Sequence, residues 1–299
     1  MSSFHDIEKY KIQPELKLIL LLLRIDNGDH VTGEINSLSG SNFDWNRFLF
    51  YVRWHRLGNF VHSALEKYPD PVPPEIAERL KNETEKGKFR IMKLSQELVL
   101  LTKIFQQKEI DIISVKGPLL SKRIFGDMCM RPSRDLDLLI PPDEIETAGK
   151  ILESAGYRMI NPKHKPSGRF MDYFVKHYSD FEYLHPEHNI IVELHWKLFN
   201  NSYLYPSGFS DLSGRAITDR FGGTEIKVLS DEDALLHLFL HGTWHNWMRL
   251  FWLYDIVGIV SGGLPVDWDG FVNRAKRSGT ARSVAGGLEL AAVLFGTDV

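Results

Sequence analysis

Apolar residues recur at helical spacing through the first hundred positions of the chain. They stand three and four residues apart, as on one face of a helix, and Asp44 is placed to cap the first of these segments. The stripes consist of Trp45, Phe48, Leu49 and Val52, of Leu57, Phe60, Val61, Ala64 and Leu65, and of Leu94, Leu98, Leu101, Ile104 and Phe105. The pattern predicts an N-terminal helical region over residues 1–108.

The pattern changes at Ile110. Residues 110–115 have the composition of a short buried strand, which enters the turn Lys116-Gly117-Pro118, and residues 119–125 have helical spacing. Residues 134–140 then predict a second strand. Asp143, with Glu146 three residues later, is placed to cap a helix that stops at Gly156.

Residues 178–185 and 189–198 alternate between apolar and polar positions, as two antiparallel strands would. In the second strand Ile190, Val192, Leu194 and Trp196 take one side, and Ile191, Glu193 and His195 take the other. Glu193 therefore interrupts an otherwise apolar stretch, which makes it a candidate site residue. We expect residues 109–229 to form an α/β core.

From Ser230 onward the chain is again helical. Ser230 and Asp233 have the spacing of a capping box, and residues 234–247 follow as a helix that carries His237, His241 and His245 on one face. A further helix is predicted from Leu250 to about Val260. These segments define a C-terminal helical region over residues 230–299.

Composition narrows the class of protein. The chain has 299 residues, 43% of them hydrophobic, so it can bury a full core. Its formal net charge of -3 gives no basic field for bulk DNA binding. Cys129 is the single cysteine, which excludes an internal disulfide and a thiolate zinc site. The apolar run 18–23 is too short to span a bilayer, so we expect a cytoplasmic protein without membrane contacts.

Asp135 and Asp137 are the most informative residues. Residues two apart on a strand project from the same face, so both carboxylates would point into one cleft. Paired carboxylates of this kind can hold a divalent metal ion. A glycine turn stands upstream, at Gly117, and Glu193 stands on a later strand.

With these motifs the chain resembles the uncharacterised bacterial nucleotidyltransferases, a branch of the DNA polymerase β-like nucleotidyltransferase superfamily. The superfamily pattern is an apolar strand ending in a glycine turn, a helix, an Asp-x-Asp or Asp-x-Glu strand, and a third acidic residue on a later strand. The matching segments are 115–117, 135–137 and 192–196, and the resemblance extends to Trp54-His55-Arg56-Leu57 and to residues 247–255. Pro118 departs from the superfamily, which has a second small residue at this position.

The resemblance implies an α/β (α+β) fold, with a mixed, mainly antiparallel sheet flanked by N- and C-terminal helical regions. It implies a two-metal, NTP-dependent enzyme that binds ATP or another nucleoside triphosphate. Asp135, Asp137 and Glu193 would hold the metals, with Glu193 alternatively accepting the acceptor's proton, and Lys116, Gly117, Arg131 and Arg134 would contact phosphates. Three carboxylates about 5 Å apart repel by roughly 3 kcal/mol per pair at an effective dielectric of about 20, which requires a cation. Oxygen ligands favour magnesium or manganese.

Other interpretations stay open. Arg131 and Arg134 would equally suit ion pairs with Asp127 or Asp135, and Lys116 would suit a solvated strand end. Pro118 removes a backbone donor from the phosphate turn, which is compatible with a nucleotide-binding regulator or a degenerate enzyme without turnover.

The helix with three histidines raises a second alternative, a His-based metal hydrolase, although structural or acceptor-side roles are favoured for His237, His241 and His245. The acceptor of the nucleotide is unidentified: a small molecule, a protein or an RNA end would each fit the resemblance.

Overall fold

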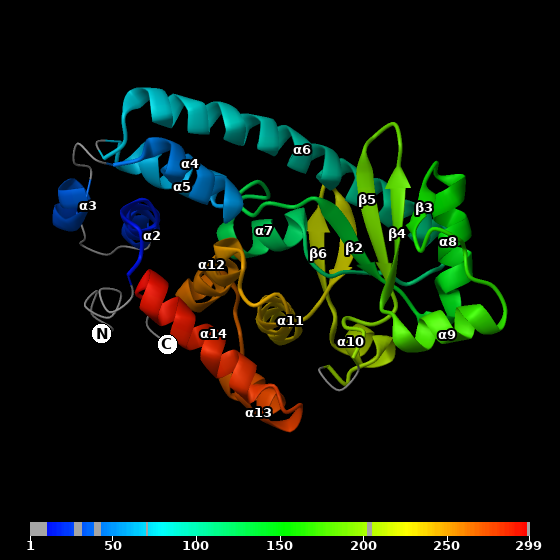
Figure 1. Ribbon diagram of the computed structural model, residues 1–299. Coiled ribbons are helices and arrows are strands. Elements are labelled where there is room, and N and C mark those ends of the chain that lie inside the picture. Colours follow the sequence, from blue (N-terminus) through cyan, green and yellow to red (C-terminus); the bar gives the residue numbers. More distant parts are fainter. Residues whose placement is uncertain (1–10, 27–31, 39–42, 70, 202–204, 298–299) are drawn as a thin grey trace.

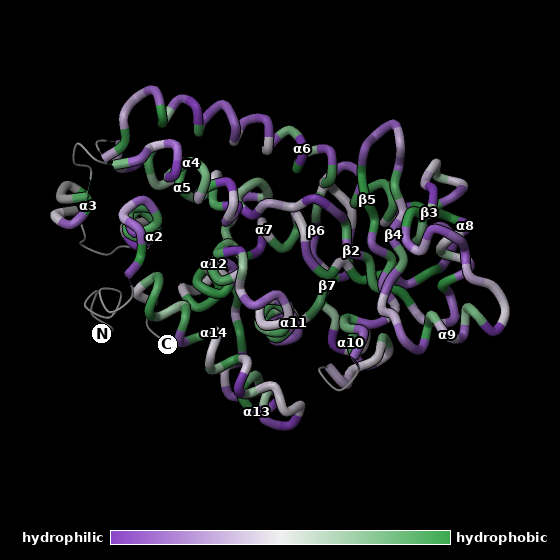
Figure 2. The backbone as a smooth tube through the Cα atoms, viewed as in Figure 1, coloured by the Kyte–Doolittle hydropathy of each residue, from purple (hydrophilic) through white to green (hydrophobic). Residues whose placement is uncertain are grey.

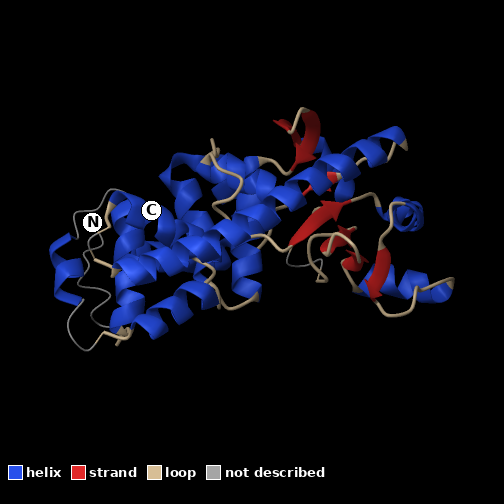
Figure 3. Ribbon diagram, turned by 90° about the horizontal axis from the view of Figure 1, so that it is seen from above, coloured by secondary structure: helices blue, strands red, loops and turns tan. Residues whose placement is uncertain are grey.

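The computed structural model describes residues 11–26, 32–38, 43–69, 71–201 and 205–297. One end of the molecule is built of helices, and the strands lie at the other end together with further helices (Figure 3). The long helix α6 (Pro74–Gln107) connects the two ends, running from α4 (Trp45–Trp54) and α5 (Gly58–Lys67) to the sheet (Figure 1). In the described residues, no helix combines the length and the apolar character needed to cross a membrane.

The chain before residue 108 is helical wherever it is described, as the apolar spacing predicts. Asp44 caps α4, because its side chain accepts hydrogen bonds from the backbone of Asn46 and Arg47. Pro74 occupies the first turn of α6, where a missing N–H costs nothing. The helices are α2 (Pro14–Asp26), α3 (Thr32–Leu38), α4 (Trp45–Trp54), α5 (Gly58–Lys67) and α6 (Pro74–Gln107).

The described strands form one seven-stranded sheet in the order β3-β4-β5-β2-β1-β7-β6. The pairs β1 with β7 and β2 with β5 are parallel, and the other four pairs are antiparallel. This confirms the mixed, mainly antiparallel sheet. The strands are β1 (Ile113–Ser114), β2 (Asp135–Leu139), β3 (Arg158–Asn161), β4 (Asp180–His185), β5 (Ile190–His195), β6 (Ile217–Phe221) and β7 (Thr224–Val228).

Further helices cover the sheet and complete the helical end of the molecule. Around the sheet lie α7 (Pro118–Phe125), a 3-10 turn (Pro142–Glu144), α8 (Ile145–Ser154), α9 (Arg169–His177) and α10 (Phe209–Arg215). The last part of the chain forms α11 (Asp231–Trp244), α12 (Leu250–Gly258), a π turn (Ile259–Gly263), α13 (Trp268–Arg277) and α14 (Ala281–Phe295). Ser230 caps α11 as predicted, since its hydroxyl accepts from the backbone of Asp233.

Three local predictions need correction. The strand expected over 110–115 is shorter, because regular strand geometry is confined to Ile113–Ser114. Asp143 does not cap α8, because it lies inside the 3-10 turn that precedes the helix, and the N-cap position, Glu144, makes no side-chain hydrogen bond. The histidine-bearing helix ends at Trp244, since Asn246 and Trp247 adopt positive φ angles that an α-helix excludes.

The apolar interior joins segments that are far apart in the sequence. One cluster combines residues of α2, α4 and α5 with residues of α12 and α14. Within it the ring of Tyr254 lies 4.6 Å from Phe60 and 5.3 Å from Phe295. The first and last helical segments therefore pack on each other beside the sheet. In Figure 2, hydrophobic colour marks α11, whereas α6 is hydrophilic along much of its length.

Candidate active site

The two adjacent strands β2 and β5 position the predicted acidic residues. They run parallel, with Asp135 opposite Ile191 and Asp137 opposite Glu193. The buried side of β5 alternates with the side that carries Glu193 and His195, as predicted. Because paired residues on neighbouring strands project from the same face, the carboxylates of Asp137 and Glu193 meet above the sheet.

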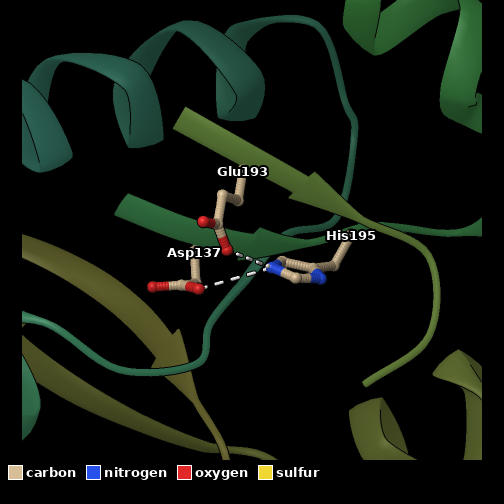
Figure 4. Close-up of side chains that lie close together, drawn as sticks. All are labelled: Asp137, Glu193 and His195. Atoms are coloured by element: carbon tan, nitrogen blue, oxygen red, sulfur yellow. Dashed lines mark hydrogen bonds and ion pairs between the residues drawn. The ribbon is translucent and has the colours of Figure 1, made fainter. Parts of the chain in front are cut away.

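Asp137, Glu193 and His195 form a tight group at this point (Figure 4). Nε2 of His195 lies 3.3 Å from Oδ1 of Asp137 and 3.2 Å from Oε2 of Glu193. Each residue offers one ligand atom, and these atoms lie within 4.8 Å of one another. The side chain of Asp137 is only 2% exposed, so its contacts are shielded from water. Among the described residues, this group has the spacing and donor set of a metal site.

His195 was not among the site residues predicted from the sequence. The alternation of β5 places it on the same side as Glu193, two residues on. That periodicity was the available signal.

Asp135 stands at the start of β2, outside the tight group. Burial raises the pKa of Asp135, and the negative charge of Asp137 raises it further, which means that the two carboxylates feel each other. The positive charges of Lys116, Arg131 and Arg56 oppose this increase. The Asp135 carboxylate thus lies on the side of the site near the arginines, and the Asp137 carboxylate lies on the side of His195.

Lys116 places an ammonium group among the carboxylates of the site. Its Nζ lies 3.0 Å from Oδ1 of Asp137, and its side chain is 15% exposed. Burial by itself would lower the pKa of Lys116, but the charges of Asp137, Asp135 and Glu193 outweigh it and raise that pKa above its usual value. Lys116 is therefore a buried ammonium, not a solvated strand end.

The protonation of the carboxylates follows from the same contacts. Burial would raise the pKa of Asp137, yet the Lys116 charge and the hydrogen bond from His195 bring it well below its usual range. Burial and the Asp137 charge raise the pKa of Glu193 to about 7, against the effect of the His195 hydrogen bond. Burial disfavours a charged His195, but its bonds to Asp137 and Glu193 raise its pKa to about 10. The site therefore contains one firmly ionised carboxylate and one that can exchange a proton near neutrality.

The second carboxylate oxygen of Asp137 tests whether a divalent cation fits here. Oδ2 of Asp137 is buried and has no hydrogen-bond partner in the described structure. A buried carboxylate oxygen without a partner carries a desolvation cost that a metal ion would remove. With a Glu193 oxygen and, after loss of its proton, the His195 nitrogen, the Asp137 carboxylate makes a donor set that fits a divalent cation.

Gly117 shapes the turn between β1 and α7. Its φ of 100° lies in the region that favours glycine, and its carbonyl accepts from the backbone of Ser121 in the first turn of α7. Pro118 takes the first helical position, where it leaves no N–H to offer a ligand. A Cβ added at Gly117 would lie 4.0 Å from the carbonyl oxygen of Asp135, and the turn has one backbone donor fewer than the superfamily pattern.

The two predicted arginines lie in different environments. Arg131 is buried, and its Nε donates to Oδ2 of Asp255 at 2.8 Å, a partner 124 residues away. Arg134 is exposed, and its carbonyl accepts from Nη2 of Arg90 at 3.3 Å. The ion pair of Arg131 is thus with Asp255, and not with Asp127 or Asp135.

A cavity of about 200 Å³ opens between the carboxylates and the histidine-bearing face of α11. Its lining combines charged groups on the sheet side with imidazoles, amides and aromatic rings on the other side. The lining residues are Val115, Lys116, Asp137, Ser179, Asp180, Glu193, His195, Leu198, Phe199, Asn200, Asn201, His237, His241, Trp244 and His245.

Burial favours the uncharged form of His237 and His241 on α11 and of His245, which follows the helix as its C-cap. Burial, followed by the positive charge of Lys116, lowers the pKa of His237 to about 3 and lowers those of His241 and His245 as well. Both ring nitrogens of His237 are buried without a hydrogen-bond partner in the described structure. In the part of the chain that is described, these histidines do not belong to the group that could hold a metal.

The family comparison covers most of the chain. A family model described as "uncharacterised nucleotidyltransferase" matches residues 41–296. The search of curated proteins gave no significant match.

Solved structures show weaker similarity. A nucleotidyltransferase-like protein of Paracoccidioides brasiliensis, described as antigenic, is 18% identical over 69% of this chain and 94% of that chain, with a TM-score of 0.43. A solution structure of the antibiotic-resistance factor ANT(2'')-Ia is 13% identical over 70% of this chain and 91% of that chain, with a TM-score of 0.35. Its crystal structure in complex with adenylyl-2''-tobramycin is 12% identical over 68% of this chain and 95% of that chain, also with a TM-score of 0.35. Similarity at this level carries no argument about the acceptor.

Proposed function

The chain belongs to the family of uncharacterised nucleotidyltransferases, and from this premise we propose that it transfers a nucleoside monophosphate from a nucleoside triphosphate, such as ATP, to a hydroxyl or phosphate group of an acceptor. The observation that carries the proposal is the convergence of Asp137, Glu193 and Lys116 on one cavity, with a buried Asp137 oxygen left without a partner. Pyrophosphate is the second product.

Asp137 and Glu193 would hold magnesium or manganese, and His195 belongs to the same described group. Asp135, two residues before Asp137 on β2, would complete the ligands of a two-metal site. When bound, the metal supplies positive charge that stabilises the triphosphate and the departing pyrophosphate. Lys116 adds a fixed positive charge beside Asp137 for contact with a phosphate. Gly117 permits close approach of the backbone, because it has no side chain at the turn.

In the alternative role, Glu193 does not bind the metal and accepts the proton of an acceptor hydroxyl. Its pKa of about 7 lets it take up a proton near neutral pH, and the contact with His195 fixes its position. The imidazoles of α11 line the opposite wall of the cavity. An uncharged imidazole both donates and accepts a hydrogen bond, which suits a hydroxyl-bearing acceptor better than a cationic one. We therefore assign the α11 face to the acceptor side.

The test is nucleotide transfer itself. The protein is incubated with each labelled triphosphate, with magnesium or manganese and with a lysate of the source cells, and the labelled product is identified. We expect label on an acceptor together with pyrophosphate release. Asp137→Asn and Glu193→Gln should each lower the rate at least ~100-fold, because several kcal/mol of charge stabilisation is lost. Glu187→Gln, in the exposed β4–β5 turn, is the matched control. Transfer that survives Asp137→Asn would refute the proposal.

A nucleotide-binding regulator is the second candidate, and Pro118 is the observation that favours it. It predicts heat on titration with a triphosphate but no pyrophosphate release in the presence of the lysate. A His-based hydrolase has less support, since the α11 histidines lie outside the described group that could hold a metal.

A further inference from the structure

Two sequence segments outside the core meet beside the active site. The start of α12 contacts the turn between α4 and α5: the backbone N–H of Phe251 donates to the carbonyl of His55 at 3.3 Å. Arg249 donates through Nη1 to the carbonyl of Trp54, and its guanidinium lies 4.0 Å from the centre of the Trp54 ring. These contacts fix the Arg249 side chain against the α4–α5 turn.

The ring of Phe251 brings two more arginines together. The guanidinium carbon of Arg56 lies 5.6 Å from the centre of this ring, and that of Arg131 lies 5.4 Å from it. Arg131 is neutralised by Asp255. Arg56 has no such partner: among the described residues, no carboxylate lies within 4.0 Å of the guanidinium groups of Arg56, Arg134 or Arg249.

The charges of these arginines act on one another. Burial and the positive charges of Arg134, Arg249 and Arg131 together lower the pKa of Arg56 to about 10, while Asp135 opposes them. Arg56 and Arg249 are half-buried and Arg134 is exposed, and cations that repel one another in this way are destabilising unless an anion joins them. The anion-binding capacity therefore lies next to Asp135, on the side of the site away from the α11 histidines.

The backbone of Arg56 supplies an independent observation. Arg56 has a φ of 56°, in the left-handed region, directly after His55 ends α4. This position after a helix is the one where glycine is favoured, because a side chain is strained there. The chain nevertheless carries an arginine whose side chain points into the cation cluster, which is the pattern of strain retained for a binding role.

We propose that Arg56, Arg134 and Arg249 form a binding site for the terminal phosphates of the nucleoside triphosphate and for the pyrophosphate that leaves. The inference rests on the proposed function and adds to it that both helical regions of the chain contribute residues to the active site. Guanidinium groups suit this ligand, because each can donate two hydrogen bonds to one phosphate.

The transfer step balances without a change in the arginines. The acceptor oxygen forms a bond to the α-phosphorus, the bond from the α-phosphorus to the bridging oxygen breaks, and pyrophosphate leaves with the electron pair. The hydroxyl proton goes to Glu193, which in this step is the base and not a metal ligand. The arginines stay protonated and hold the charge that develops on the leaving group.

The test measures binding of inorganic pyrophosphate and of ATP by isothermal titration, without turnover. Arg56→Gly is the decisive variant, because it removes the guanidinium and relieves the backbone strain, so lost binding cannot be ascribed to misfolding. We expect both affinities to fall at least about tenfold while the melting temperature is kept or raised. Arg249→Gln should weaken both ligands similarly. Arg220→Gln, exposed on β6, should change neither.

The outcomes separate the two claims. Unchanged affinity for pyrophosphate and ATP in Arg56→Gly and Arg249→Gln, with transfer intact, overturns this inference and leaves the proposed function standing. Weaker pyrophosphate binding with unchanged ATP binding also overturns it, and assigns the arginines to a phosphorylated acceptor. If the variants lose both affinities and the parent protein itself transfers no nucleotide, the anion site is supported and the proposed function is refuted.

Discussion

Nζ of Lys116 lies 3.0 Å from Oδ1 of Asp137, the same oxygen that Nε2 of His195 approaches to 3.3 Å. Two cationic groups therefore meet at one carboxylate oxygen, while Oδ2 of Asp137 has no partner in the described structure. Lys116 and a divalent cation would compete for the negative charge of Asp137, since both are positive and both need it. A substitution that removes the charge of Lys116 should therefore change metal affinity and activity in opposite directions.

Lys116→Met should bind manganese more tightly and transfer nucleotide more slowly. Removing a positive charge close to the cation site favours the metal by at least about tenfold in affinity, because like charges repel strongly in a buried site. The same change removes a phosphate contact, so transfer should fall by about tenfold or more. Titration with manganese alone and a pyrophosphate-release assay measure the two effects.

Lys103→Met, exposed on α6, is the matched control and should alter neither quantity. Weaker manganese binding in Lys116→Met would mean that Lys116 supports the carboxylate geometry instead of competing with the metal.

The buried pair of Arg131 and Asp255 should be a stability element. Asp255 is fully buried and Arg131 is 3% exposed. Asp255→Asn leaves the arginine charge buried and unpaired, which costs about 3–5 kcal/mol of unfolding free energy. Urea unfolding measures this cost. The double variant Arg131→Met/Asp255→Leu should recover most of it, because burial of the charge itself is then avoided. A double variant as unstable as Asp255→Asn would contradict this account.

Local periodicity predicted the acidic side of the site. Alternation along β2 and β5 placed the carboxylates of Asp137 and Glu193 on one side of each strand, and the parallel register then brought them together. The same alternation placed His195 beside Glu193, but an isolated histidine on a strand gives no sign of its partners. The fold class followed from the family resemblance and is confirmed by the strand pairing.

Contacts between distant segments were beyond the reach of the sequence. Arg131 lies 124 residues from Asp255, and the contact between Arg249 and Trp54 spans 195 residues. Nothing local distinguishes these partners from other charged or aromatic residues. Asp143 illustrates a different failure. The spacing of a capping residue is present there, but residues 142–144 form a 3-10 turn and α8 begins only after it. The division at residues 108 and 229 stays a proposal.

The α11 histidines should affect the acceptor and not the nucleotide. His241 and His237 line the cavity but lie outside the described metal-binding group. His241→Ala should lower the yield of labelled product and change the affinity for ATP with magnesium less than about twofold, since its imidazole contacts neither metal nor phosphate in this assignment. Thr243→Ala, exposed on the same helix, is the control. Zinc-dependent activity that requires His241 and survives Asp137→Ala would favour the hydrolase instead.

His237 should make the stability of the protein depend on pH. Its pKa in the folded state is about 3, against an ordinary value of 6.5, because burial disfavours the charged ring. Between these values the unfolded chain binds a proton that the folded chain does not, so this contribution to stability is complete above pH 6.5 and is lost as the pH falls.

The variant His237→Leu removes this proton and isolates its effect. The unfolding free energy of the variant minus that of the parent protein should be larger at pH 4.5 than at pH 7.5, by roughly 2–3 kcal/mol. The reason is that each pH unit below 6.5 costs the parent protein about 1.4 kcal/mol of stability. Urea unfolding at the two pH values measures the difference.

Asp255 and Glu193, with raised pKa values of about 6 and 7, act in the opposite direction, but they are present in both proteins and cancel. Phe239→Leu, buried on the same helix without a titrating group, should cost the same at both pH values. An equal difference for His237→Leu at both pH values would mean that the imidazole takes up a proton as readily in the folded protein as in the unfolded chain, and the α11 wall would then carry charge at pH 4.5.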